Sequence, residues 1–337
     1  MATAIGTLKN LADWGKELDP DGSTAAVTEL LSQYNGIVKT AMFREGNLPT
    51  GHRVTQRTGL PAVYWRMINK GVPTGKATTV LVDEQCGMLT SRSEIDKSLV
   101  ELNGHTASYR LSQSRAHIEA MNQELAGTMI YGTAANPEEF VGLAPRYSSL
   151  SGTIGANVLS AGGSTNLTSI YLVGWGDTAI SGVFPKGSMA GMQREDLGVI
   201  DAFDSDSNRF RAYAEYFEQK AGLCVEDWRY GVRIPNIDIV ALAALTGTQL
   251  VTASTSILAL MSRAIDRLQS TSGITPVFYA NRTVLSLLRV AALRAASNVV
   301  TVEAGLNQFG DSIFTTRFLG IPVEIEDQIT NSETAVA

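Results

Sequence analysis

The side chains best able to carry acid–base or metal chemistry are sparse in this sequence. Its three histidines are His52, His105 and His117. The last two would lie about 18 Å apart on one continuous helix, which is too far for a shared metal ion. No HExxH, CxxC or GxSxG motif occurs, and such motifs place the ligands and nucleophiles of many hydrolases. The sequence therefore predicts no catalytic, cofactor-binding or metal-ligating residue.

Carboxylates are the remaining candidates. They cluster as Glu195 with Asp196, as Asp201, Asp204 and Asp206, and as Glu324, Glu326 and Asp327. The run 201–210 alternates oxygen donors that suit a hard cation, but it lacks the glycine turn and terminal Glu of an EF-hand loop, so we interpret it as a solvated turn. The alternative function is a soluble enzyme with a carboxylate-based hydrolytic site, built on residues such as Glu226 and Asp227. No paired acid–base motif supports it.

Two glycine-rich stretches have some features of nucleotide-binding loops. A phosphate loop needs four residues between its glycines, whereas three separate Gly71 from Gly75. Ala77 also stands where that pattern needs Ser or Thr. The stretch GWGDTAISG, which begins at Gly174, lacks the third glycine of a dinucleotide fingerprint. Both are interpreted as turns, and no cofactor is expected.

Composition excludes several classes of protein. The chain has 337 residues, 44% hydrophobic and 18% charged, with a net charge of -6 and two cysteines. A negative chain is unsuited to coating nucleic acid, and two distant cysteines exclude a disulfide framework. The low share of charge indicates surface that is buried against partners. Because the sequence has neither a secretory pattern nor a run of 18 apolar residues, we expect no secretion and no membrane span.

The first hundred residues predict an arm followed by a long hairpin. In the arm, apolar residues recur at helical spacing at Val27, Leu30, Leu31 and Tyr34, too few to fold alone. From about residue 48 to 104, the alternating stretches PAVYWRMIN and ATTVLVDE flank the turn-rich NKGVPTGK. This pattern predicts an extended β-hairpin with Lys70 and Lys76 exposed at its tip.

The strongest helix prediction covers 105–130. Its apolar stripe consists of Leu111, Ile118, Met121, Leu125 and Met129. A helix of this length spans roughly 35–40 Å and would form a spine. Gly132 and the Asn136–Pro137 pair then end it. Arg110 and Arg115 fall on the polar faces, where pairing with Glu119 or subunit contacts are favoured over contacts with DNA.

The remaining residues predict alternating strands and helices. A polar loop at 148–166 precedes a buried strand at 169–176. After the acidic turn, two β-like runs, FRAYAEYFEQKAGLCVED and WRYGVRIPNIDI, are expected to form a meander. Ser254 or Thr255 caps one helix, with an apolar face at Ile257, Met261, Ala264, Ile265 and Leu268. Asn281 caps another, with a face at Val284, Leu287, Leu288, Ala291 and Ala295. Strands are expected at ITPVFYA and, as a pair, in FTTRFLGIPVEIEDQI.

Four phrases carry a family resemblance. They are NPEEFVGLAPRY, KAGLCVEDWRYGVRIPNID, TPVFYANRTVLSLLRVAA and FLGIPVEIEDQITNSE. Through them the sequence resembles the podovirus-type major capsid proteins of tailed bacteriophages, which have the Hong Kong 97 fold. The resemblance implies an α+β fold with an N-terminal arm at 1–47, an extended E-loop hairpin at 48–104, a spine helix and peripheral domain at 105–150, an axial and peripheral β-rich region at 151–253, and axial helices with C-terminal strands at 254–337.

The same resemblance implies function and partners. The chain would be a non-enzymatic, self-assembling subunit of the icosahedral head of a tailed double-stranded DNA phage, located in the virion and assembled in the host bacterial cytoplasm. It would form pentamers and hexamers with a separate scaffolding protein, a portal and, in some relatives, a cement or decoration protein, and would enclose DNA without sequence-specific contact. Some relatives also join subunits through an E-loop lysine; Lys70 or Lys76 is placed for this, but neither an Asn partner nor a Glu base can be assigned.

Overall fold

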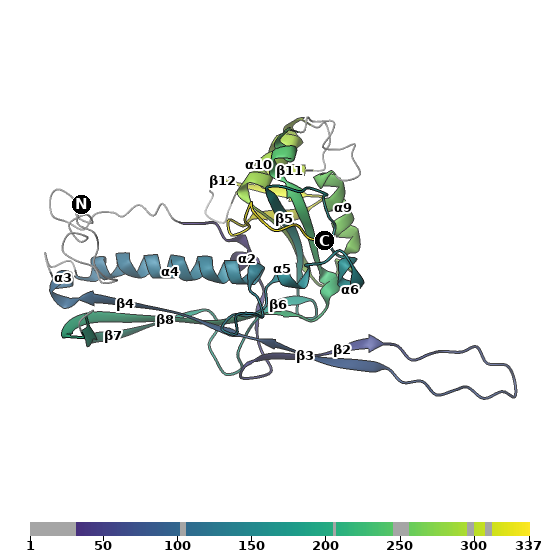
Figure 1. Cartoon of the computed structure of the whole chain (residues 1–337), viewed down its shortest axis with the longest axis horizontal. Coiled ribbons are helices and arrows are strands. Elements are labelled where there is room, and N and C mark those ends of the chain that lie inside the picture. The colour runs from purple at the N-terminus through teal and green to yellow at the C-terminus, as the bar shows by residue number, and fades with distance from the viewer. Residues whose placement is uncertain (1–31, 102–105, 205–206, 245–255, 295–299, 307–311) are drawn as a thin grey trace.

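The computed structural model describes residues 32–101, 106–204, 207–244, 256–294, 300–306 and 312–337. A compact body lies between two projections that leave it in opposite directions (Figure 1). One projection is a β-ribbon covered by a long helix, and the other is a hairpin that stands free of the body. The arrangement is a mixed α+β fold, as expected.

The body is built on one mixed sheet whose strand order is β11-β12-β13-β10-β5-β6-β8-β4. Three more strands join it: β9 pairs with β5, β1 with β6, and β7 with β8. The bounds are β1 (Phe43–Glu45), β4 (Gly87–Asp96), β5 (Leu167–Trp175), β6 (Ile180–Phe184), β7 (Met192–Phe203), β8 (Arg209–Val225), β9 (Gly231–Asp238), β10 (Thr275–Ala280), β11 (Val300–Leu306), β12 (Ser312–Phe318) and β13 (Ile321–Ile325). The strands predicted at 169–176, in ITPVFYA and near the C-terminal end are confirmed.

Strand β5 is buried along its whole length because it faces two cores. Alternate side chains point to opposite faces of a strand. Ile170 and Leu172 accordingly join the core under α9 (Ile257–Arg267) and α10 (Arg282–Arg294), and Tyr171 and Val173 join the core on the other face. A strand buried on both faces reads as a continuous apolar run, which is why the sequence predicted it.

The predicted caps of the two body helices are partly corrected. The N-cap of α9 is Ser256, whose hydroxyl accepts a hydrogen bond from the Ala259 amide; Ser254 and Thr255 lie outside the described residues. Asn281 caps α10 as predicted, since its Oδ1 accepts from the Val284 amide at 2.8 Å. A cap of this kind stabilises a helix by about 1 kcal/mol.

The spine helix α4 (Thr106–Tyr131) lies along the ribbon of β4, β7 and β8 (Figure 1). Strand β8 pairs with β4 over ten residues and with β7 on its other edge. The helix ends where predicted, and the Gly132 amide still donates to the Thr128 carbonyl at 2.9 Å. The short helix α3 (Lys97–Glu101) precedes it.

The predicted apolar stripe of this helix is wrong in its first half. Met121, Leu125 and Met129 are buried, but Leu111 and Ile118 are 47% and 40% exposed. Tyr109 and Ser114 are buried instead. The reason is that the first half of the helix lies over a polar part of the ribbon, where the Ser114 hydroxyl donates to the Glu215 carboxylate at 2.5 Å.

The free hairpin consists of β2 (Gly51–Gly59) and β3 (Thr78–Gln85) in antiparallel register. The strand predicted over PAVYWRMIN is wrong, because residues 60–77 are extended or turned and form no ladder. Pro61 and Pro73 lack the amide proton that a ladder needs, and Asn69 has φ of 67°, which breaks a strand. Lys70 and Lys76 are exposed, as expected.

Both ends of the described chain are held by the body. Helix α2 (Gly36–Thr40) packs near β10 and β13, and residues 326–337 return across β5. Of the arm helix predicted around Val27 to Tyr34, residues up to 31 lie outside the described part, and Tyr34 is not helical. The remaining short elements are α5 (Leu143–Arg146), α6 (Gly152–Gly155), η2 (Trp228–Tyr230) and α7 (Ile239–Ala244).

Candidate assembly surfaces

The root of the hairpin is fixed to the body by polar contacts. Glu84, which is buried on β3, receives two hydrogen bonds from the Arg146 guanidinium at 2.6 and 2.7 Å. A planar guanidinium that binds both oxygens of a carboxylate fixes orientation as well as distance. On β2, the Gln56 amide donates to the carbonyls of Val225 and Glu226 at 3.3 and 2.9 Å. The direction in which the hairpin leaves the body is therefore set at its base.

A cluster of possible metal ligands lies beside this root. Atoms of His52, Cys224 and Glu226 lie within 4.8 Å of one another. The Nη2 atom of Arg44 lies among them, 3.4 Å from His52 Nε2 and 3.9 Å from Cys224 Sγ, and it is ion-paired with Glu226. The guanidinium already supplies the positive charge that the carboxylate needs. We interpret the cluster as a structural ion pair at the base of the hairpin.

The two carboxylates of the alternative hydrolytic site bind different cations. Glu226 pairs with Arg44, while Asp227 accepts from the Arg229 amide at 3.0 Å and from its guanidinium at 2.7 Å. Burial raises the pKa of Asp227, but the hydrogen bonds from Arg229 outweigh it and hold this pKa below the usual value. A general acid typically needs a raised pKa, so the lowered pKa of Asp227 is unsuited to that role. The geometry gives this site no support.

Two of the other carboxylate clusters also supply structural contacts. Asp204 lies in the turn between β7 and β8, where it accepts from the Asn208 amide at 2.8 Å, while Asp206 is outside the described residues. Asp196 is ion-paired with Arg110 at 2.8 Å, and this hydrogen bond lowers the pKa of Asp196. The turn interpretation of the acidic run is therefore supported.

The polar face of the spine helix binds the ribbon beneath it. Arg110 pairs with Glu215 at 2.7 Å, and Arg194 of β7 reaches the same carboxylate at 2.7 Å. Burial raises the pKa of Glu215, but the two arginines and Ser114 lower it further than burial raises it. Arg110 thus pairs across to the sheet, while Arg115 is exposed.

The histidines are spread over unrelated surroundings. His117 on the helix forms a 2.7 Å hydrogen bond with Ser91 and stacks on Phe217 with ring centroids 5.7 Å apart. His52 lies at the hairpin root, and His105 is outside the described residues. His117 packs as a core-edge side chain, which was the favoured interpretation.

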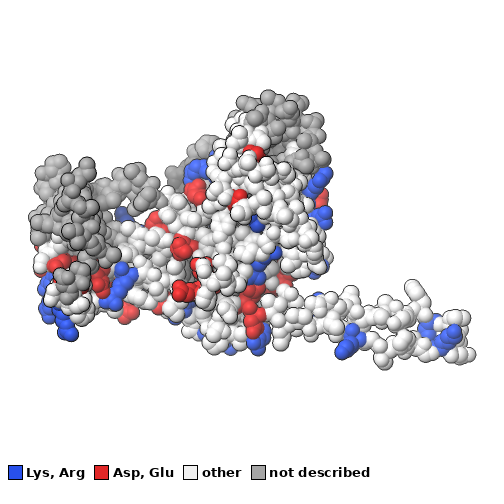
Figure 2. Space-filling model, in the orientation of Figure 1, with Lys and Arg blue, Asp and Glu red and all other residues white. Residues whose placement is uncertain are grey.

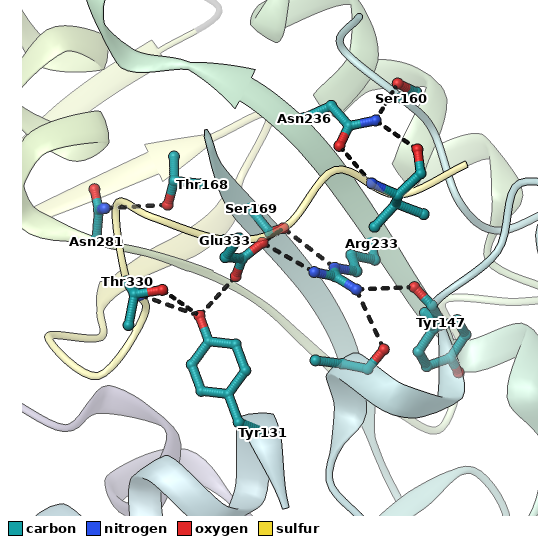
Figure 3. A network of polar contacts seen from close by, with 12 residues as sticks. Tyr131, Tyr147, Ser160, Thr168, Ser169, Arg233, Asn236, Asn281, Thr330 and Glu333 are labelled. Atoms are coloured by element: carbon teal, nitrogen blue, oxygen red, sulfur yellow. Dashed lines mark hydrogen bonds and ion pairs between the residues drawn. The ribbon is translucent and has the colours of Figure 1, made fainter. Parts of the chain in front are cut away.

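A buried polar network holds the C-terminal segment on β5 and β9 (Figure 3). Arg233 donates to Glu333 at 2.9 Å and to the carbonyls of Ala144 and Tyr147 at 3.2 and 3.1 Å. Tyr131, at the end of the spine helix, donates to the other Glu333 oxygen at 2.6 Å. Burial and the adjacent Glu333 raise the pKa of Tyr131, which keeps it a proton donor. Spine helix, sheet and C-terminal segment therefore meet at one carboxylate.

Sequence reasoning missed this network. Glu333 follows a polar stretch in which no periodic pattern distinguishes it from solvent-facing carboxylates, and its partner is 100 residues away. The only available signal was Arg233, a charge inside the otherwise apolar run of a buried strand. A buried charge requires a partner, so this residue predicts an acid without identifying it.

Among the described residues, the outer part of the hairpin exposes a group of large apolar side chains that the rest of the chain does not cover. Its exposed large apolar residues are Leu60, Val63, Tyr64, Trp65, Met67, Ile68 and Val72. Residues 54–82 contain no Asp or Glu but include Arg57, Arg66, Lys70 and Lys76. Figure 2 shows this basic, otherwise uncharged projection against a body on which acidic groups gather. A contiguous exposed apolar surface of this kind is typical of an interface.

Two remaining expectations concern thiols and membranes. Cys86 and Cys224 are both free thiols, and burial raises the pKa of each to about 11. Such thiols are poor nucleophiles. Among the described residues, every helix falls short of the length and apolar character that a bilayer span requires.

The comparisons agree with this arrangement. The family model for the major capsid protein GP7 matches residues 19–337. A chain in the structure of bacteriophage Epsilon15 is 32% identical, with a TM-score of 0.76, and the match covers 100% of this chain and 99% of that one. A chain of the bacteriophage JBD30 capsid is 10% identical, with a TM-score of 0.48 and coverage of 89% and 92%. No curated protein sequence matches.

The Epsilon15 match extends over both projections as well as the body, because it covers the whole chain. The fold is therefore the Hong Kong 97-type capsid fold. A family match over residues 19–337 also leaves little of the chain outside it. The chain belongs to the GP7 family of major capsid proteins and is a structural subunit of the head of a tailed bacteriophage.

Proposed function

We propose that copies of this chain associate through their hairpins into pentamers and hexamers that close an icosahedral shell around double-stranded DNA. The observation that carries the proposal is the outer part of the hairpin, because seven large apolar side chains there are exposed although the body buries its apolar residues in two large cores. Burying one such side chain contributes about 1.5–3 kcal/mol. A chain gains that energy by contact with another copy.

The two projections suit ring formation. Contacts between unlike surfaces generate closed rings when the rotation between neighbours closes. The hairpin and the ribbon leave the body in opposite directions (Figure 1), so the hairpin of one copy can reach the helix side of the next. In this proposal residues 48–104 include the E-loop, 105–150 the spine helix and peripheral domain, 151–253 the axial and peripheral β-rich region, 254–337 the axial helices and C-terminal strands, and 1–47 the N-terminal arm.

The proposal includes partners and a place of assembly. Shell closure in the host bacterial cytoplasm would use a separate scaffolding protein and a portal, and a cement protein would be optional. The DNA inside would be enclosed without sequence-specific contact, since the net charge is -6 and base recognition needs side chains that reach base edges. Lys70 and Lys76 are exposed, and a covalent link from either stays the less favoured alternative because no Asn partner can be assigned.

The test is expression of the full chain, alone and together with a scaffolding protein from the same phage, followed by negative-stain microscopy and sedimentation. We expect closed particles tens of nanometres wide in at least one of the two conditions. A uniform monomer in both would contradict the proposal, and hydrolysis of ester or glycoside substrates by that monomer would favour the enzyme alternative.

A further inference from the structure

The N-terminal part of the described chain is attached to the body through carboxylates. We call residues 33–40, which include helix α2, the arm root. Hydrogen bonds of 2.9 Å hold it: the Gln33 amide donates to Glu119, the Tyr34 amide to Asp327, the Tyr34 hydroxyl to Glu324, and the Ile37 amide to Glu326. Three of these acceptors form the acidic cluster at 324–327. This cluster therefore binds the arm root.

Glu326 differs from the other acceptors because its side chain is fully buried. Its two oxygens accept from the Ile37 amide at 2.9 Å and from the Gln328 amide at 3.4 Å. Among the described residues no Lys or Arg forms an ion pair with it, whereas the adjacent Asp327 pairs with Arg282 at 2.7 Å. An ionised Glu326 is therefore a buried charge without a counter-ion, which is unfavourable.

A second buried polar group of the arm root faces the same strand end. Asn35 lies opposite Glu326 in an isolated antiparallel bridge and is 7% exposed. Neither the Nδ2 nor the Oδ1 atom of Asn35 has a hydrogen-bond partner. A buried amide without partners is unfavourable, and so is a buried charge. Opening of the arm root hydrates both groups, which offsets part of the loss of the apolar contacts of Ile37 and Val38 with the core.

We infer that Glu326 is a proton-dependent switch: the arm root docks on the body while this carboxyl group is protonated and detaches more readily when it is ionised. Burial raises the pKa of Glu326 to about 7, against the amide bonds from Ile37 and Gln328, and the charge of Asp327 raises it further. Opening hydrates the carboxyl group and returns its pKa to the ordinary value of about 4.3. Docking is therefore strongest below about pH 4 and weakens as the pH rises through 7.

Other titratable or charged groups face this contact from each neighbouring element. They are Lys39 on α2, Glu119 on α4, Tyr279 on β10, Glu324 on β13, and Asp327 with its partner Arg282. The carboxylates among them are partly exposed, so water solvates their charge. Burial raises the pKa of Tyr279, which stays neutral. Glu326 is therefore the group whose change of charge alters docking near neutral pH.

Hydrogen exchange of the full-length subunit between pH 5 and pH 8 tests the switch. After correction for the intrinsic pH dependence of exchange, the opening constant of peptides covering 33–40 should rise roughly 10- to 100-fold over this range. Peptides covering β5 serve as the internal control and should keep their protection. A flat profile at 33–40, or an equal rise in β5, would overturn the inference.

Two variants identify the titrating group. Glu326→Gln, which carries no charge at any pH, should keep the arm root protected at pH 8. Asp327→Asn removes the adjacent negative charge and should move the end of the rise to lower pH, which decides the matter even if Glu326→Gln does not fold. Glu324→Gln is the matched control and should keep the parent's profile. A parent-like profile in Asp327→Asn, or in a folded Glu326→Gln, would show that Glu326 does not control the arm root.

Discussion

Arg233 and Glu333 form a buried ion pair at 2.9 Å, with side chains only 6% and 5% exposed. The pair joins β9 to a segment 100 residues further along the chain, and Ser169 and Tyr131 donate to the same carboxylate. Both oxygens of Glu333 therefore accept hydrogen bonds. Breaking one partner of such a pair leaves an uncompensated buried charge.

Glu333→Ala should therefore lower the free energy of unfolding by about 3–5 kcal/mol. Chemical denaturation of the subunit measures the change. The control is Arg282→Ala, which breaks the pair with Asp327 at 2.7 Å, in which the arginine is 64% exposed. An exposed pair contributes about 0–1 kcal/mol, so equal losses in both variants would contradict the role assigned to Glu333.

Glu326 should make stability depend on pH near neutrality. Its side chain is fully buried, and burial raises its pKa to about 7, against smaller opposing effects of hydrogen bonds from the Ile37 and Gln328 amides. The folded state therefore holds this proton more tightly than the unfolded state, whose pKa is about 4.3. The stabilisation is fully present below about pH 4 and is lost as the pH rises through 7.

Glu326→Gln should remove this dependence and stabilise the subunit at pH 8 by up to about 3 kcal/mol. Thermal or chemical denaturation between pH 5 and pH 8 measures it. Glu324→Gln, at a partly exposed position on strand β13, which ends one residue before Glu326, is the control and should keep the parent's slope. If both variants lose stability equally between these pH values, Glu326 is not the titrating group.

Leu125→Asp should destabilise the subunit by several kcal/mol or render it insoluble, because it places a carboxylate in the core beneath the spine helix. Leu111→Asp is the matched control on the same helix, since Leu111 is 47% exposed and should tolerate the change. Soluble yield and melting temperature distinguish the two. A parent-like Leu125→Asp would show that the wrong face of the helix is assigned to the core.

Replacing residues 70–76 by a short Gly-Ser link should leave circular dichroism unchanged, since these residues form no ladder and are exposed. Particle formation should be lost. A variant that still closes normal shells would refute the role of the tip, and one that unfolds would show that the hairpin contributes to the fold.

Purified subunits should bind DNA weakly, with binding erased by salt, because the net charge of -6 offers few phosphate contacts. A filter or mobility assay over a salt series measures this. Nanomolar binding at physiological salt, or preference for one DNA sequence, would contradict the proposal that the shell encloses DNA without sequence-specific contact.

Sequence patterns predicted the body well because its elements have strong local signals. Strand β5 is an unbroken apolar run, and Asn281 caps α10 by a contact three residues away. The first half of the spine helix was wrong because its buried face is polar: Ser114 is buried by a carboxylate on β8, and periodicity in apolar residues cannot show that.

The candidate surfaces were predicted less completely. Exposure of Lys70 and Lys76 followed from turn composition, but the strand expected over 61–69 failed because alternation of apolar and polar residues does not supply a ladder partner. The apolar groove lined by Met88, Leu125 and Phe140 was not predictable, since these residues come from β4, from α4 and from the loop after α4, which only the fold brings together.

Strand β8 belongs to both the ribbon and the body, since Phe217 lies under the spine helix while Leu223 and Val225 lie in the body core. Its ladder bonds are perpendicular to the strand. Tension applied to the far end of the ribbon, such as outward pressure on a closed container, would therefore load many of these bonds together in shear instead of opening them one after another. The continuous backbone of β8 thus transmits tension directly between the ribbon and the body.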